Sequence, residues 1–289
     1  MKLATISDNG KIKAGMIVGE EFVCCDESNT ANMAVLSLIT SGNVSKWEAM
    51  LETAPRKKLS EIKILAPIPH LLRDMICVGK NYYAHAKEFF DSGFDATQKE
   101  TIPSEPIIFT KAMTSLIGPD EAIDTSIDPT DSVDYEGELG VVISKNARRV
   151  AKADWNDYVF GYVIINDVTS RELQKKHNQW TIGKGLDTFG PMGPFIVTKD
   201  EIDDLRSMQI QTLVNNEIRQ QAEVRDLIFD IPTLIETLTL TGTLLAGDII
   251  ATGTPVGVGI GFSPPKFLQS GDKVTINVTG LGTLTNPVI

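Results

Sequence analysis

The feature of this 289-residue sequence that most restricts its fold is a series of short apolar segments with the length and composition of β-strands. In the second half and centre of the chain they lie at residues 105–111, 138–144, 161–167, 193–198, 210–217, 247–253 and 273–280. Short apolar runs bounded by Gly, Pro, Asn or Asp are typical of strands. Too few helical segments separate them for the alternation that a doubly wound parallel sheet requires. The sequence therefore predicts a mixed α/β chain that is rich in β-structure.

Residues 1–66 are expected to form a small N-terminal α/β domain. Strand patterns joined by Asn-Gly and Gly turns come first, and two helical patterns follow them. Residues 66–69 read Ala-Pro-Ile-Pro, which is typical of a linker. The remaining residues, 70–289, are expected to form the larger, catalytic domain.

Two helices can be predicted from their end signals. Asn81 is a suitable N-cap for a helix over residues 82–91, and Pro232 suits the first turn of a helix within residues 226–242. Residues 91–106 are polar and contain two prolines, so they are expected to form a long loop. Long loops inside compact domains are often functional lids.

Composition excludes several classes of partner. The net charge of −11 and the pI near 4.8 argue against binding to nucleic acid or to an anionic membrane surface.

The three cysteines include no CxxC pair, which indicates a reducing compartment. The sequence shows neither a signal peptide nor an apolar run of about 18 residues, so a cytoplasmic protein without a membrane span is expected.

Glu136 and Glu138 stand at the start of an apolar segment. Side chains alternate between the two faces of a strand, so these carboxylates are expected on the same face. Two like charges beside a buried strand are costly unless a cation neutralises them, and oxygen ligands favour Mg²⁺ or Mn²⁺. The alternative is an exposed strand end that carries two surface glutamates.

Asp167 follows the apolar residues 162–166 and precedes a helical pattern at residues 169–179. It is a candidate for a third carboxylate ligand, or alternatively for a helix N-cap. Arg171 and Gln174 follow at spacings that would place all three side chains on one helical face. A guanidinium and an amide beside a metal ligand would suit an anionic substrate.

His85 is one of three histidines, and Glu88 follows it at the spacing that brings helical side chains into contact. Glu88 could orient the imidazole and make it a general base, or the two could form an ordinary surface pair.

Lys184, between two glycines, could stabilise negative charge that develops on a substrate, or lie exposed in a turn. Thr254 lies in a glycine-rich segment without the Lys-Ser/Thr of a phosphate-binding loop. Its hydroxyl could contact a substrate, or the segment could be a simple tight turn.

Taken together, six ordered segments resemble the fumarylacetoacetate hydrolase family, and the resemblance covers roughly residues 70–289. They read CVGKNYYAHAKE, DYEGELGVVI, GYVIINDVTSRELQ, QWTIGKGLDTFGPMGP, GDIIATGTPVGVG and GTLTNPV. The resemblance implies a β-sandwich roll with a small N-terminal domain, usually in a homodimer. It implies that a bound Mg²⁺ or Mn²⁺ ion has the ligands Glu136, Glu138 and Asp167. The implied catalytic residues are His85 and Glu88, on a lid segment, and Lys184. The implied substrate contacts are Arg171, Gln174 and Thr254.

No acidic residue occurs at positions 79–84, whereas fumarylacetoacetate hydrolase itself carries an additional aspartate ligand shortly before its catalytic histidine. The resemblance therefore points to the acylpyruvase, decarboxylase and isomerase branch of the family. It implies metal-dependent hydrolysis of a C–C bond in a small 2,4-dioxo acid, such as an acylpyruvate, through a metal-bound pyruvate enolate. The alternatives are decarboxylation of oxaloacetate, isomerisation of an unsaturated 2-oxo dicarboxylate, and a non-catalytic metal-binding module.

Overall fold

The computed structural model describes residues 1–94 and 101–289, and the chain begins with strands at one edge of a large sheet. These strands are β1 (Lys2–Asp8), β2 (Lys11–Val18), β3 (Glu21–Asp26), β4 (Arg56–Lys58) and β5 (Lys63–Ile64). Two short helices, α1 (Ala34–Ser41) and α2 (Ser45–Glu48), connect β3 to β4. The order of strands followed by two helices agrees with the sequence prediction, although α2 is only one turn long.

The same sheet continues into the rest of the chain. Its further strands are β6 (Met75–Gly79), β7 (Ile107–Lys111), β8 (Leu116–Ile117), β10 (Gly137–Ile143), β11 (Val159–Asn166), β13 (Gly190–Thr198) and β16 (Ile249–Ala251). The 12 strands run in the order β4-β3-β2-β1-β13-β11-β10-β16-β6-β7, with β5 beside β1 and β8 beside β13. Because β1 pairs directly with β13, one sheet crosses the predicted boundary. The division into domains at residues 66–70 stays a prediction.

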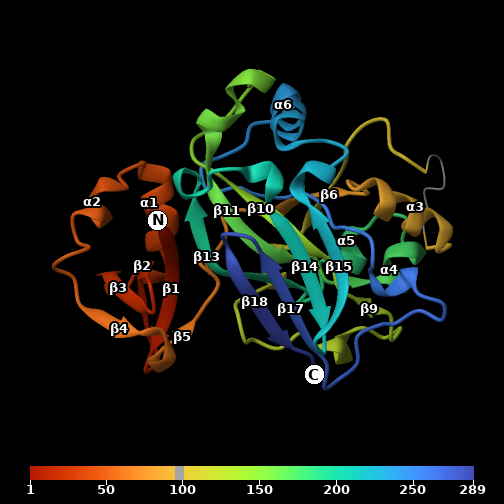
Figure 1. Ribbon diagram of the computed structural model, residues 1–289, viewed down its shortest axis with the longest axis horizontal. Coiled ribbons are helices and arrows are strands. Elements are labelled where there is room, and N and C mark those ends of the chain that lie inside the picture. The colour runs from red at the N-terminus through yellow and green to blue at the C-terminus, as the bar shows by residue number, and fades with distance from the viewer. Residues whose placement is uncertain (95–100) are drawn as a thin grey trace.

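A second sheet of four antiparallel strands packs against the first. It contains β14 (Gln209–Val214), β15 (Glu217–Glu223), β17 (Lys273–Val278) and β18 (Gly282–Pro287). Figure 1 shows these strands in front of β10 and β11. A short pair, β9 (Val133–Asp134) with β12 (Thr169–Ser170), forms the third sheet. The prediction of a β-rich, mixed α/β sandwich is confirmed.

The buried core explains why the central strands are apolar except at the end that carries Glu138 and Asn166. Leu139 and Val141 of β10 pack with Ile210 and Ile276 of the four-stranded sheet. Val142, which faces the other way, packs in a separate cluster that includes residues of α1. Since both faces of β10 are covered, the strand shows no alternation of polar and apolar residues.

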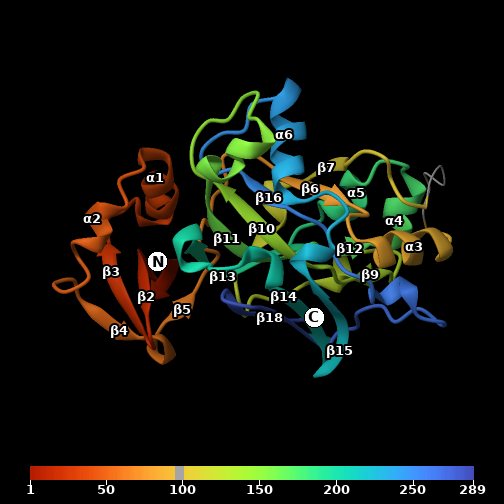
Figure 2. The ribbon, with the colours of Figure 1, turned by 45° about the horizontal axis from the view of Figure 1, so that its top comes forward.

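The remaining α-helices are α3 (Tyr83–Asp91), α4 (Arg171–Lys176), α5 (Thr181–Lys184) and α6 (Ile231–Thr241). Short 3₁₀ helices are η1 (Ala31–Met33), η2 (Leu59–Glu61), η3 (Met113–Ser115), η4 (Thr125–Ile127), η5 (Lys152–Tyr158), η6 (Lys199–Glu201), η7 (Leu205–Ser207), η8 (Val224–Asp226) and η9 (Gly259–Gly261). Figures 1 and 2 show α3, α4 and α5 grouped at the end of the molecule opposite the N-terminal strands. No helix in the described part of the chain is both long and apolar enough to cross a membrane.

Two predictions about helix ends are wrong. Asn81 does not cap α3, because its side chain instead bonds the backbone of Phe229 and Thr252 and ties three distant segments together. Asp167 does not share a helical face with Arg171 and Gln174, because α4 begins only at Arg171. The predicted lid loop includes residues 95–100, which lie outside the described residues.

Candidate active site

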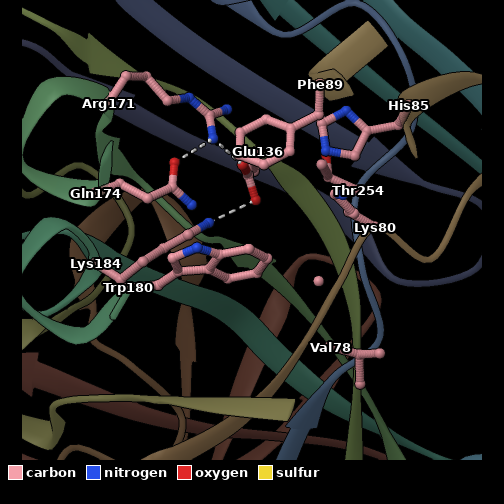
Figure 3. A pocket seen from close by; sticks show the side chains of 11 residues that line it. Val78, Lys80, His85, Phe89, Glu136, Arg171, Gln174, Trp180, Lys184 and Thr254 are labelled. Carbon is pink, nitrogen blue, oxygen red and sulfur yellow. Dashed lines mark hydrogen bonds and ion pairs between the residues drawn. The ribbon is translucent and has the colours of Figure 1, made fainter. Parts of the chain in front are cut away.

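A pocket lies among β6, α3, α4 and α5, with an empty volume of about 270 Å³ that includes some open solvent. Its lining residues are Val78, Gly79, Lys80, His85, Phe89, Glu136, Arg171, Gln174, Trp180, Lys184 and Thr254. Figure 3 shows Arg171, Gln174 and Lys184 on one side of Glu136 and His85 on the other. The pocket thus brings together six of the predicted site residues, which are far apart in the sequence.

The three predicted metal ligands lie together because of the register between β10 and β11. Gly137 pairs with Asn166, so Glu136 and Asp167 meet where the two strands end. The backbone N–H of Asp167 donates to Glu136 O at 2.9 Å, and Asn166 Oδ1 accepts the N–H of Glu136 at 3.0 Å. Oxygen atoms of Glu136, Glu138 and Asp167 all lie within 4.8 Å of one another, and all three residues are buried.

The buried side chains of Lys184 and Arg171 neutralise part of this cluster. Lys184 Nζ lies 2.8 Å from Glu136 Oε2 and 2.7 Å from Asp167 Oδ2, and Arg171 Nη1 lies 2.7 Å from Glu136 Oε1. Burial by itself would raise the pKa of Glu136, but Lys184 and Arg171 outweigh it and lower that pKa to about 2. Burial would lower the pKa of Lys184, yet the charges of Asp167 and Glu136 raise it. Both side chains are therefore charged at neutral pH.

Glu138 lacks such a partner. Its carboxylate accepts the N–H of Gly253 at 2.8 Å, but no cationic side chain of the described residues lies within 4.0 Å of it. Burial raises the pKa of Glu138 well above its usual range, and the charges of Asp167 and Glu136 add to this effect. A buried site with excess negative charge and only oxygen donors fits a hard divalent cation such as Mg²⁺ or Mn²⁺.

His85 and Glu88 form a pair that is buried rather than exposed on the surface. His85 Nδ1 lies 3.1 Å from Glu88 Oε2, and the two side chains are 5% and 11% exposed. The N–H of Gly257 holds Glu88 Oε1 at 3.0 Å. With the proton on Nδ1 donated to Glu88, Nε2 is left as the acceptor of a neutral imidazole. His85 lines the pocket, and Glu88 contacts it through the His85 ring rather than directly. The catalytic role of the two residues stays a prediction.

The three predicted substrate contacts differ in how free their polar atoms are. Arg171 Nη1 donates to Gln174 Oε1 at 3.3 Å, while Arg171 Nη2 is buried without a hydrogen-bond partner in the described residues. This nitrogen could meet a substrate oxygen. Thr254 lines the pocket, but its hydroxyl donates to Gly137 O at 3.0 Å and accepts from Gln220 at 2.7 Å. The hydroxyl of Thr254 thus already makes two hydrogen bonds within the protein, and its only donor is used in one of them.

Two buried charges at the site were not predicted. Lys111, at the end of β7, places Nζ 2.9 Å from Asp167 Oδ1. Asp134 accepts Arg171 Nε at 2.9 Å and so holds the guanidinium in place. Asp134 could have been found by extending the alternation of Glu136 and Glu138 by one further step. Lys111 carried the weaker signal of a single charge at the end of an apolar segment.

Replacing Lys111 by methionine is expected to destabilise the metal-free protein by about 3–5 kcal/mol, because it breaks a buried ion pair and leaves one side of Asp167 unpaired. Urea unfolding in excess chelator measures the change. The matched control is Lys63→Met, which removes the exposed Lys63–Glu121 pair and should cost about 0–1 kcal/mol. Equal effects of the two substitutions would contradict the prediction.

Sequence comparison identifies relatives across most of the chain. Residues 74–289 match the model of the fumarylacetoacetate hydrolase C-terminal domain. The chain is 50% identical over 230 residues to the oxaloacetate tautomerase YisK of Bacillus subtilis (strain 168). The aligned region covers 80% of this chain and 74% of that protein. The resemblance inferred from the six sequence segments is thereby confirmed.

Solved structures of the same fold span the entire chain. A fumarylacetoacetate hydrolase from Exiguobacterium antarcticum is 37% identical with a TM-score of 0.86, and the match covers 100% of this chain and 99% of that one. The maleylpyruvate hydrolase from Sphingobium sp. SYK-6, solved with manganese(II) and pyruvate, is 30% identical with a TM-score of 0.81 and the same coverage. From these matches and the arrangement of the site, the chain belongs to the fumarylacetoacetate hydrolase family of enzymes.

Proposed function

We propose that this enzyme interconverts the enol and keto forms of a small 2-oxo dicarboxylate of the oxaloacetate type. The observation that carries the proposal is the position of His85, whose ring is oriented by Glu88 and lines a pocket that also contains Lys184 and Arg171. A fixed base opposite fixed positive charges is what proton transfer next to a carbonyl group needs. The 50% identical oxaloacetate tautomerase supports this choice of substrate.

The reaction moves protons and adds or removes no other atom. In the direction from enol to keto, Nε2 of His85 would take the proton of the enol O–H and then deliver it to C3, so the O–H bond breaks, a C–H bond forms and the imidazole ends neutral. Glu88 keeps Nδ1 protonated throughout. Lys184 uses two N–H groups on Glu136 and Asp167, so its third N–H could donate to the oxygen that becomes negatively charged. Arg171 Nη2 would bind a substrate carboxylate.

Glu136, Glu138 and Asp167 would hold the metal ion, in agreement with the charge imbalance around Glu138. When bound, Mg²⁺ or Mn²⁺ would supply a Lewis acid that polarises the 2-oxo group. The proposal also includes a homodimer and the choice of Mg²⁺ or Mn²⁺ as the ion. The proton transfer by His85 depends on neither of these two points.

A second candidate is hydrolysis of a C–C bond in an acylpyruvate-like 2,4-dioxo acid. The same His85–Glu88 pair could take a proton from water, and the 30% identical maleylpyruvate hydrolase supports this reading. Hydroxide would add to the distal carbonyl, and the C–C bond would break to leave pyruvate and a carboxylic acid. Decarboxylation of oxaloacetate needs the positive charges of the site but no base.

The test is to mix the enol form of oxaloacetate with the protein and follow the ultraviolet absorbance of the enol. In Mg²⁺ or Mn²⁺ we expect faster decay than with the metal alone, and no acceleration in excess chelator. No CO₂ should form, and acetylpyruvate should stay intact.

Other products would assign the other reactions. CO₂ from oxaloacetate would identify a decarboxylase, whereas acetate and pyruvate from acetylpyruvate would identify the hydrolase. Tight metal binding without any of these reactions would contradict the proposal and favour a non-catalytic metal-binding module.

A further inference from the structure

The carboxylate of Glu88 occupies a space that only a glycine opposite it leaves open. A Cβ atom built on Gly261 would lie 1.9 Å from Glu88 Oε1 and 2.4 Å from Glu88 Cδ. The backbone of Gly261 is not in the left-handed region, so its conformation does not demand glycine. The space taken by Glu88 is the physical reason for a glycine here.

Asp134 and Tyr135 hold the turn that contains Gly261 by hydrogen bonds to its backbone. Asp134 accepts the N–H groups of Gly259 at 2.6 Å and Ile260 at 3.1 Å, and it is fully buried. Tyr135 donates its hydroxyl to Gly257 O at 2.9 Å. These contacts come from the residues just before the ligand Glu136, so the turn cannot move away without disturbing the strand that carries the metal ligands.

The same turn also forms a direct hydrogen bond with the carboxylate of Glu88. The N–H of Gly257 is shared by both oxygens of Glu88, at 3.0 Å from Oε1 and 3.2 Å from Oε2, and Oε2 also lies 3.1 Å from His85 Nδ1. The backbone donor thus fixes the carboxylate, and Oε2 of that carboxylate orients the imidazole. A shift of the carboxylate would release the ring from its position in the pocket.

We propose that the turn Gly257–Gly261 positions the His85–Glu88 pair, and that Gly261 must lack a side chain for Glu88 to reach His85. Gly261 is then a positioning residue that acts through Glu88 and does not touch the substrate. Where turnover is the readout, the inference rests on the proposed function. The geometry of the imidazole can be measured without it.

The test is Gly261→Ala. The atoms that the new methyl group meets belong to the flexible end of Glu88, and Glu88 borders an open surface depression into which it can turn. We therefore expect a folded protein with a displaced Glu88. In the metal-free protein, ¹⁵N NMR of His85 should lose the signature of an Nδ1–H bonded to a carboxylate. With oxaloacetate, kcat should fall about 10-fold or more while KM changes little.

Two further variants make the test specific. In a Glu88→Ala background, Gly261→Ala should cause no additional loss of kcat, because the group it displaces is gone. The control is Gly242→Ala at the end of α6, where the Cβ would meet only Leu238 O, at 3.2 Å, and where the NMR signature and kcat should stay unchanged.

An unchanged NMR signature in Gly261→Ala would overturn the inference, as would an equal loss of kcat with and without Glu88. If the signature is lost but neither Gly261→Ala nor Glu88→Ala affects the enol reaction, the positioning by Gly261 stands and the proposed role of the pair in that reaction fails.

Discussion

Replacing Glu138 by glutamine should abolish metal-dependent activity and yet make the metal-free protein more stable. Glutamine keeps the shape but removes one of three carboxylate ligands, so metal affinity should fall by more than the 10–100-fold typical of a lost outer partner. In the metal-free protein, the carboxyl group of Glu138 is buried beside Asp167 and Glu136, and no cationic side chain among the described residues forms an ion pair with it. Removing that charge should stabilise the fold by about 1 kcal/mol or more at neutral pH.

The pH dependence of this gain follows from the sign of the pKa shift. The folded protein raises the pKa of Glu138 above its unfolded value. Below the unfolded pKa of about 4.3 the carboxyl is protonated in both states and costs nothing. As pH rises from the unfolded pKa to the folded pKa, the unfolded state has lost its proton while the folded state still holds it, so the stability of the fold declines over this range. The advantage of glutamine should therefore be present at neutral pH and vanish in acid.

The control for this variant is Glu136→Gln, for which the opposite sign is expected. Glu136 is paired with Lys184 and Arg171, and its pKa is lowered to about 2. Losing its charge leaves two buried cations underpartnered, which should cost about 3–5 kcal/mol. Calorimetric titration with Mg²⁺ and urea unfolding in chelator measure both effects. Metal affinity within tenfold of wild type in Glu138→Gln would contradict the assignment of the ligand.

His85→Asn should lower turnover of the enol substrate by about 10²–10⁴-fold, which is the range for loss of a general acid or base. Metal affinity and KM should change little, because the imidazole forms no ion pair with the carboxylate cluster within the described residues. Stopped-flow absorbance with saturating Mg²⁺ measures the turnover. His177→Asn, an exposed position at the end of α4, is the matched control.

Full activity of His85→Asn would remove the His85–Glu88 pair from the mechanism. If such a variant still released CO₂ from oxaloacetate, the site would be one in which the positive charges alone promote the reaction. The outcome therefore distinguishes proton transfer by His85 from decarboxylation, independently of the metal ligands.

Local patterns in the sequence located most of the apolar strands, although not β15 or β18, and nominated six of the residues that line the pocket. Runs such as those of β10 and β11 are apolar because both of their faces are buried, and burial leaves a direct trace in composition. Glu136, Glu138 and His85 stand out because charges and a histidine at strand and helix spacing are conspicuous beside apolar segments. Their grouping into one family pattern depended on six segments taken in order.

Only the tertiary structure decided which of these side chains meet, because contacts between distant segments leave no periodic signal. Asn81 is of a residue type that often caps helices, but its side-chain amide forms hydrogen bonds with the backbone of Phe229 and Thr252 instead. Lys111 appears as an ordinary strand-end lysine until the fold buries it against Asp167. Gly261 looks like any glycine of a turn, and its meaning appears only when Glu88 occupies the space beside it. Sequence spacing determined which groups the chain has available, and packing across the sheet determined their partners, since a buried charge must be satisfied by whatever the fold brings near it.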